Sequence, residues 1–545
     1  MEPRNSGFEV VGDLLVHEGV DTLFGLMGEA NAGLIGHCVQ RHGVRYISTR
    51  HEGGAVGMAE GYARASGRIG VATVTYGPGV TNALTAITSA ARNRAQVLVV
   101  TGQREPGLRS RNQFIDQAAM LAPTGAGIFA IYRPSDIEAG VAAAMSFIRR
   151  EARPAVINLS VEMAEGRLEE GWRAEAAPPA ATTGPIPLAM PDETQVLAAA
   201  SILAEARRPV VIAGRGAVSD DGVAAIVRLA EASNAALMTS LLAKGSFHGH
   251  ALDRGIAGGF GTAAGQACLE EADVVVAFGA SLNLWTTRLG KGFPKAQLIH
   301  VDTDAEAFAN AVIKAEIALE GDAGLTADAL REGLTRGSRS QENWPANMAE
   351  PALNHDESRP LHPGALCERL DKILPEARTI SLDAGHFFEY PARHLRAPDA
   401  RGFLFTAGFG SIGLGLATAI GAALGRPDRL SVAMLGDGGF LMSLAELETA
   451  VRYRIPMLVV VMNDNAYGAE VKLLEHHGWD TGLARFDNPD IATLAEGFGA
   501  RSVRVRTADD VARIAVDTID GPVLVDAAID PDVTAHWVML ARGGA

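Results

Sequence analysis

Gly436-Asp437-Gly438 and, further along the chain, Asn463-Asp464 decide the fold. Each segment ends an apolar run that is typical of a buried parallel strand, Leu430 to Leu435 and Met457 to Met462. The stretch between them, Leu444 to Arg452, has apolar residues at helical spacing. Open α/β sheets bind ligands at the carboxyl ends of their strands. This strand–helix–strand unit therefore predicts that the two aspartates lie close together at one sheet edge.

The composition of this edge indicates a bound anion and a cation. Two hard oxygen ligands beside glycines suit Mg²⁺ that holds a diphosphate. Glycines let backbone N–H groups approach phosphate oxygens, and the start of the following helix favours the negative charge. The alternative interpretation is a buried turn in which Asp437 and Asp464 only cap their neighbours. The flanking strands favour the metal site.

The unit resembles the diphosphate-binding motif of thiamine-diphosphate enzymes, a GDG followed after a fixed interval by an Asn pair. The second Asn of the motif is Asp464 here, which keeps an oxygen ligand and adds a negative charge. The resemblance implies Asp437, Asp464 and the backbone carbonyl of Ala466 as the metal ligands. The residues that it further implies for cofactor binding are Gly436, Gly438, Gly439, Tyr467, Gly468 and Ala469.

A second set of motifs stands in the first block of the chain. Arg50-His51-Glu52-Gly53-Gly54-Ala55, Met58 to Arg64, Gly77 to Asn82 and Val100 to Gln103 resemble, in order and spacing, the pyrimidine-binding domain of acetolactate-synthase-like thiamine enzymes. The resemblance implies that the Glu52 carboxylate drives the aminopyrimidine of the cofactor into the tautomer that removes the proton from the reactive carbon. It also implies cofactor contacts at Pro78 and Asn82. Taken alone, Glu52 is equally compatible with a helix cap.

Two segments before the GDG complete the expected cofactor site. Gly385-His386-Phe387 matches a family segment that contacts the diphosphate and the reaction space. In Gly410-Ser411-Ile412, the resemblance implies that Ile412 props the cofactor in a bent form and that the Gly410 carbonyl accepts a hydrogen bond from its amino group. Residues 408–413 also satisfy G-x-G-x-x-G, a weak signal for a dinucleotide-binding fold. In that fold an acid should end the next strand, but Asp428 precedes that strand, so the thiamine interpretation fits better.

Bulk properties exclude several classes of partner. The 545 residues are 48% hydrophobic and 21% charged, with a formal net charge of −16 and no cluster of Lys and Arg. These values indicate a globular, core-rich protein and predict that it does not bind nucleic acid. The polar start, the lack of an apolar run of transmembrane length and three scattered cysteines predict a cytoplasmic protein without a membrane partner. We see no Cys/His metal cluster.

Two Pro-rich stretches divide the chain into three blocks. Residues 174–191 and 336–363 are typical of exposed linkers. We predict a pyrimidine-binding domain at 1–173, a central Rossmann-like domain at 192–335 and a diphosphate-binding domain at 363–545. Strand and helix signals alternate throughout, which predicts an α/β fold of three doubly wound parallel sheets. In the family the cofactor lies between the first block of one subunit and the last block of another, which implies a homodimer or homotetramer.

Three positions favour the 2-oxo-acid decarboxylases of this group, such as those of benzoylformate and pyruvate. Glu29 and Glu470 match active-site acids there, and Ile412 is the usual residue at its position. The adjacent His-His pair of the decarboxylases is missing, and Gln113 stands in that region as a candidate substrate contact. Each glutamate could instead be a solvated loop acid. The arginine-containing flavin element of acetolactate synthases matches residues 280–288 poorly, so we do not expect FAD.

The resemblance implies a thiamine-diphosphate- and Mg²⁺-dependent lyase or transferase. It would decarboxylate a 2-oxo acid to an enamine, followed by protonation or carboligation. A lyase or decarboxylase of 2-hydroxyacyl or oxalyl coenzyme A is the nearest alternative, with Arg207, Arg208 and Arg215 as weak candidates for a nucleotide groove. A catalytically silent regulatory homologue is an alternative of another class, and a nicotinamide dehydrogenase is more remote.

Overall fold

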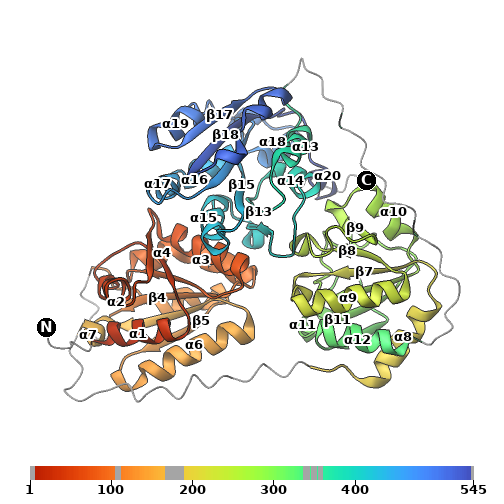
Figure 1. Ribbon diagram of the computed structural model, residues 1–545, viewed down its shortest axis with the longest axis horizontal. Helices are drawn as coiled ribbons and strands as arrows, with labels where there is room; N and C mark the ends of the chain where they lie inside the picture. Colours follow the sequence, from red (N-terminus) through yellow and green to blue (C-terminus); the bar gives the residue numbers. More distant parts are fainter. Residues whose placement is uncertain are drawn as a thin grey trace.

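The computed structural model describes residues 6–104, 112–165, 189–334, 344, 353 and 360–541. These residues form three six-stranded sheets with helices packed around each of them (Figure 1). Neighbouring strands are parallel in every pair. This confirms the expected α/β fold with three doubly wound parallel sheets.

The first sheet has the strand order β2-β1-β3-β4-β6-β5. Its strands are β1 (Thr22–Gly25), β2 (Arg45–Ser48), β3 (Gly70–Val74), β4 (Val97–Gln103), β5 (Gly127–Ile131) and β6 (Ala155–Ser160). Its helices are α1 (Gly7–His17), α2 (Ala32–His42), α3 (Glu52–Ser66), α4 (Pro78–Arg92), α5 (Gln117–Leu121), α6 (Ile137–Glu151) and α7 (Val161–Glu165).

The third sheet has the order β14-β13-β15-β16-β18-β17 and so repeats the topology of the first. Its strands are β13 (Arg378–Leu382), β14 (Phe403–Phe405), β15 (Leu430–Gly436), β16 (Met457–Asn463), β17 (Arg501–Val505) and β18 (Pro522–Ala528). Its helices are α13 (Pro363–Ile373), α14 (Glu389–His394), α15 (Gly415–Gly425), α16 (Asp437–Ser443), α17 (Ala445–Arg452), α18 (Gly468–His477), α19 (Ile491–Phe498) and α20 (His536–Ala541).

The middle sheet has the order β12-β11-β10-β7-β8-β9. Its strands are β7 (Pro209–Ala213), β8 (Ala236–Thr239), β9 (Asp253–Ile256), β10 (Val274–Phe278), β11 (Gln297–Asp302) and β12 (Ile317–Glu320). Its helices are α8 (Glu193–Glu205), α9 (Asp220–Ser233), α10 (Ala263–Glu271), α11 (Ala305–Asn310) and α12 (Ala323–Gly333).

The first and third sheets are joined through helices α3 and α15, which lie against each other (Figure 1). Glycines permit this approach: a Cβ at Gly61 would stand 2.0 Å from the Thr418 carbonyl oxygen, and one at Gly421 would stand 1.9 Å from that of Met58. Apolar side chains of both helices share one buried core with β3 and β15. The helix that begins with Glu52 is therefore fixed against the diphosphate-binding half of its own chain.

The boundaries 1–173, 192–335 and 363–545 stay a prediction. Each sheet falls inside one of these blocks, but most of the two linker regions lies outside the described residues. Among the described helices, none combines the length and the apolar character that crossing a membrane requires.

Candidate functional site

A large cavity, of about 990 Å³, opens at the carboxyl ends of β13, β15 and β16. The order of the sheet reverses between β13 and β15, and such a reversal is where doubly wound sheets bind ligands. Many predicted residues of the last block line this cavity: Gly385, His386, Phe387, Gly410, Ile412, Gly436, Asp437, Gly438, Gly439, Asp464, Ala466, Tyr467, Gly468, Ala469 and Glu470.

Asp437 and Asp464 meet in this cavity. Their strands are neighbours, with Gly436 of β15 in register with Met462 of β16. Their exposed fractions are only 2% and 8%, and the two carboxyl groups interact directly. Burial raises the pKa of both carboxyls, and the charge of Asp437 raises the pKa of Asp464 further. Two buried, adjacent carboxylates require a cation or a proton between them.

Hydrogen bonds from the surrounding residues hold the two aspartates in place. The Asn488 amide donates a hydrogen bond to Asp437 Oδ2 at 2.6 Å, and the backbone of Ala466 donates to both carboxyls. Gly468 allows the close approach of the next helix, because a Cβ there would stand 2.2 Å from His386 Nδ1 and 2.7 Å from Asp464 Oδ2. The atoms available to bind a cation are therefore carboxylate oxygens, in a polar recess lined by glycines.

His386 closes one side of the recess. Its Nε2 atom is 3.6 Å from Asp464 Oδ2, and its side chain is buried. Burial, with a smaller contribution from Lys472, lowers the pKa of His386 to about 4. The imidazole is therefore neutral near pH 7 and does not balance the charge of the aspartates. Phe387 packs beneath Gly436, where a Cβ would stand 2.9 Å from its ring.

The segment 410–412 lines the opposite wall. Gly410 has φ +75°, a conformation that favours glycine, and a Cβ there would meet nothing within 4 Å. Its backbone thus faces open space in the cavity. Ile412 also lines the cavity. The Ser411 hydroxyl is buried and has no hydrogen-bond partner among the described residues. A bound group with polar atoms could satisfy it.

The predicted residues of the first block form a second cluster, at the carboxyl ends of β1, β2, β3 and β4. Glu52 begins α3 and is 6% exposed, and the Asn82 amide donates to its Oε2 atom at 3.0 Å. The backbone carbonyl of Gln113 packs against Gly77, which directly precedes Pro78 at the start of α4. Glu29 is 65% exposed, with Oε1 3.7 Å from the Arg104 guanidinium.

The two clusters do not meet within one chain. Glu52, Pro78, Asn82, Glu29 and Gln113 are not among the residues that line the large cavity. Its lining from the first block consists of the residues at the end of α4, namely Arg92 and Asn93.

The arginines considered for a coenzyme A groove are not brought together. Arg207 and Arg208 precede β7, whereas Arg215 follows it, so they lie at opposite edges of the middle sheet. The Arg208 guanidinium pairs with Glu271, and Arg215 donates to the Asn93 carbonyl oxygen at 2.5 Å. Of the three, Arg215 lines the large cavity.

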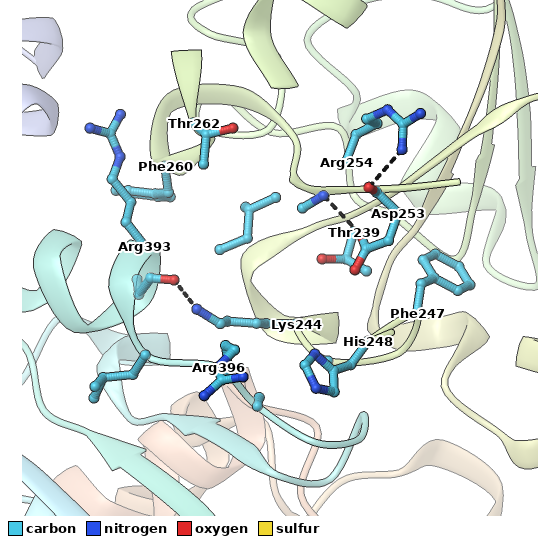
Figure 2. A pocket seen from close by; sticks show the side chains of 16 residues that line it. Thr239, Lys244, Phe247, His248, Asp253, Arg254, Phe260, Thr262, Arg393 and Arg396 are labelled. Carbon is cyan, nitrogen blue, oxygen red and sulfur yellow. Dashed lines mark hydrogen bonds between the residues drawn. The ribbon is translucent and has the colours of Figure 1, made fainter. Parts of the chain in front are cut away.

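A smaller cavity of about 290 Å³ lies between the middle and last blocks (Figure 2). Basic side chains project around it, but they are already engaged: Arg393 pairs with Glu389, Arg396 pairs with Asp371, and Lys244 donates to the Ala392 carbonyl oxygen. None of the residues predicted for the site lines it. The Lys244–Ala392 contact connects the middle block to the last block, whereas the two arginine pairs lie within the last block.

Several residues of the site escaped the sequence analysis. Asn488 stands in a loop far from Asp437, and no motif marked it. Asp383 follows β13 and accepts hydrogen bonds from Gly413 N at 2.8 Å and from Thr406 Oγ1 at 3.1 Å. Its position two residues before Gly385 was a usable signal. Trp285 of the middle block and Trp537 also line the cavity.

Family models match the three blocks in order. The N-terminal TPP binding domain of thiamine pyrophosphate enzymes matches residues 5–120, their central domain matches 196–330, and their C-terminal TPP binding domain matches 383–527.

Curated relatives match nearly the whole chain. A probable acetolactate synthase large subunit of Methanocaldococcus jannaschii is 30% identical over 96% of this chain and 92% of its own length. A probable 2-ketoarginine decarboxylase of Pseudomonas aeruginosa is 33% identical, covering 92% and 89%. Acetolactate synthase isozyme 3 large subunit of Escherichia coli is 28% identical, covering 99% and 97%. With the cavity at β13, β15 and β16, these matches place the chain in the family of thiamine-diphosphate enzymes that includes acetolactate synthases and 2-oxo-acid decarboxylases.

Proposed function

We propose that this enzyme uses thiamine diphosphate and Mg²⁺ to break or form the C–C bond beside the carbonyl of a 2-oxo acid. One observation carries the proposal: Asp437 and Asp464 are buried side by side in a glycine-lined cavity at the switch point of the third sheet. When bound there, thiamine diphosphate supplies the electron sink for the carbanion chemistry.

The residues of the cavity fit a magnesium diphosphate. Asp437, Asp464 and the carbonyl of Ala466 would supply hard oxygen ligands, which Mg²⁺ prefers. The cation would relieve the repulsion between the two buried carboxylates, because the neighbouring His386 is neutral near pH 7 and does not balance their charge. The start of α16 and the glycines around it would face the phosphate oxygens. Gly410, Ser411 and Ile412 would contact the remainder of the cofactor.

Glu52 is proposed as the carboxylate that exchanges a proton with the cofactor ring. It is buried at the first position of α3, and the amide of Asn82 fixes its Oε2 atom. A carboxylate held in this way keeps one oxygen free for a ring nitrogen. Positioned acid–base groups contribute about 10²–10⁴-fold in rate. Pro78 and Asn82 would border the same ring.

The complete site is proposed to form between two copies of the chain. Glu52 belongs to the first block and does not line the cavity that holds Asp437, and α3 is fixed against α15 of its own chain. A second copy would bring its own Glu52 to the cavity mouth. Apolar side chains there are exposed in the single chain, including Met442 at 63% and Tyr467 at 38%. Covering them would favour association.

Acidic groups would then reach the substrate from both chains. Glu470, in the first turn of α18, lines the cavity and is exposed to it. Glu29 and Gln113 lie with Glu52 at the edge of the first sheet and would arrive with the second copy. A decarboxylase must protonate its intermediate, and a carboligase must handle the protons of the acceptor, so acids at this place serve either outcome.

The substrate class follows from the family and from the relatives' names. One relative is named for a decarboxylase of 2-ketoarginine, which is itself a 2-oxo acid. A coenzyme A thioester is supported less well, because Arg207 and Arg208 are separated from Arg215 by a whole strand. A catalytically silent role would leave the buried Asp437–Asp464 pair and the Glu52–Asn82 pair without a use.

A substrate panel tests the proposal. Purified protein with saturating thiamine diphosphate and Mg²⁺ is incubated with assorted 2-oxo acids, alone and with aldehyde or second 2-oxo acid acceptors, and with coenzyme A thioesters. CO₂ release and organic products are followed together by mass spectrometry. We expect CO₂ from at least one 2-oxo acid. Turnover of thioesters alone would favour the coenzyme A alternative, and no turnover of any carbonyl substrate would favour a silent homologue.

A further inference from the structure

A separate group of metal-ligating side chains lies on the first block, away from the cofactor residues. Asp13 of α1 and the two histidines His37 and His42 of α2 bring their ligand atoms within 4.8 Å of one another. His37 Nε2 is 2.7 Å and His42 Nε2 is 2.6 Å from the same Asp13 Oδ1 atom. No sequence motif marks this cluster, because Asp13 and the histidines come from different helices and the two histidines are five positions apart.

Both imidazoles aim at one point in space. Each Nε2 atom lies within hydrogen-bond distance of Asp13 Oδ1, to which its N–H donates. Loss of the two Nε2 protons would therefore leave two lone pairs directed at the place where the carboxylate oxygen now lies. The rings are in edge-to-face contact, crossing at 69° with centroids 5.2 Å apart. Zn²⁺ binds imidazole nitrogen at about 2.0–2.1 Å and carboxylate oxygen at about 2.0–2.2 Å. A small rotation of the exposed Asp13 side chain would admit the ion between the three atoms.

The helices hold the ligands rigidly. Val11 and Leu15 of α1 and Leu34 and Cys38 of α2 are buried in one core cluster, so the two helices are fixed relative to each other. Gly12 allows their close contact, because a Cβ there would stand 2.9 Å from the His37 ring. A site that exists before the ion arrives loses little conformational entropy on binding.

The charges and exposures suit a cation. Asp13 offers a carboxylate oxygen beside the two imidazole nitrogens. The side chains of Asp13, His37 and His42 are 57%, 16% and 25% exposed, which gives an entering ion a path and leaves positions for water. Three protein ligands with open positions are typical of zinc sites that also bind water.

We propose that Asp13, His37 and His42 form a second metal site that takes a divalent transition metal such as Zn²⁺. Imidazole nitrogen suits Zn²⁺ and Co²⁺, whereas Mg²⁺ prefers the oxygen ligands of the aspartate pair. The ion would connect α1 to α2 and stabilise the first block by a free energy that rises with the logarithm of the free ion concentration once this exceeds Kd. The proposal does not depend on the reaction that the enzyme catalyses.

Zinc titration of the loaded enzyme tests the site. The protein is freed of transition metals by chelation, saturated with thiamine diphosphate and Mg²⁺ to occupy the aspartate pair, and titrated with ZnCl₂ by calorimetry in a non-coordinating buffer. We expect one tight Zn²⁺ per chain and a higher unfolding temperature. The His37→Ala/His42→Ala variant should bind Zn²⁺ at least about tenfold more weakly and lose that thermal shift.

Two further variants keep the test decisive. His476→Ala/His477→Ala removes another neighbouring pair of histidine rings, whose centroids are also 5.2 Å apart, and should bind Zn²⁺ like the wild type. Asp13→Asn preserves the shape of the side chain and should weaken binding while turnover with Mg²⁺ stays unchanged. Co²⁺ should give a visible absorption band in the wild type that the His37→Ala/His42→Ala variant lacks. Equal affinity and stoichiometry in the wild type and in that variant would overturn the proposal.

Discussion

Glu446 Oε1 accepts a hydrogen bond from the backbone N–H of His51 at 2.9 Å. The same carboxylate accepts from Arg50 N at 3.1 Å. Glu446 comes from α17, in the helical crossover that joins Asp437 to Asp464, and His51 directly precedes Glu52. The diphosphate-binding half of a chain therefore sets the position of the Glu52 helix in the same chain, although we propose that this glutamate serves a neighbouring copy.

Removing that acceptor is expected to loosen the Glu52 helix. Glu446 is 2% exposed, and Glu446→Ala removes the acceptor from the backbone N–H groups of Arg50 and His51, at a cost of about 1–3 kcal/mol in unfolding free energy. We expect a lower melting temperature and reduced kcat. Glu448→Ala, on the same helix, is the matched control, because it removes only surface ion pairs with Arg50 and Arg452, each of which contributes about 1 kcal/mol or less. Equal effects of the two substitutions would show that Glu446 has no special role.

The charge added by Asp464 has a measurable consequence. Asp464→Asn keeps an oxygen ligand but removes the repulsion with Asp437, which burial makes strong. The variant without metal should melt at a higher temperature than the wild type without metal, while its affinity for Mg²⁺ with thiamine diphosphate falls roughly tenfold. Scanning calorimetry with and without Mg²⁺ measures both effects. A lower melting temperature of the metal-free variant would contradict this interpretation.

Asp383 predicts a pH dependence of stability. Complete burial raises its pKa to about 6, although hydrogen bonds from Gly413, Ala384 and Thr406 partly offset this. A carboxyl whose pKa is raised in the folded state binds its proton more tightly there than in the unfolded chain. The protonated Asp383 therefore contributes to the free energy of unfolding at pH 4, and this contribution is lost as the pH rises to 6. The difference in stability between the wild type and Asp383→Asn should shrink over this range by at most about 3 kcal/mol. A difference that stays constant between pH 4 and pH 7 would exclude the assigned shift.

Mixing two inactive variants tests the proposal that the site is shared. Glu52→Gln should bind the cofactor but lose most activity, and Asp437→Ala should fail to bind it. If each site combines Glu52 of one chain with Asp437 of another, dissociating and reassociating an equal mixture restores one intact site in each mixed dimer. Activity should then reach roughly one quarter of the wild-type value, because half of the dimers are mixed. If both residues come from one chain, the mixture stays inactive.

Much of this architecture could be predicted from the sequence because it depends on local patterns. The apolar runs before Asp437 and Asp464 correspond to β15 and β16, with ends that differ by one residue from those expected. The carboxyl ends of parallel strands must share one sheet edge, so the meeting of the two aspartates followed from topology. The Glu52–Asn82 contact follows the same logic across β2 and β3.

Other features could not be predicted because they depend on how distant segments pack. Nothing near Asn488 indicates its hydrogen bond to Asp437, since the connecting loop has no periodic pattern. Glu446 reads as a surface residue of an amphipathic helix until α3 is placed against it. The convergence of Asp13 with His37 and His42 requires the angle between α1 and α2, which no spacing rule contains.

Titration calorimetry of thiamine diphosphate tests the central claim most directly. Wild-type protein freed of metals is titrated with the cofactor in the presence and in the absence of Mg²⁺, and the Asp437→Ala variant is titrated in parallel. We expect one cofactor per chain with Mg²⁺, much weaker uptake without it, and no Mg²⁺ dependence in the variant. Uptake by the wild type that is equally tight with and without Mg²⁺, or that survives unchanged in Asp437→Ala, would contradict the assignment of the aspartate pair as the metal and diphosphate anchor.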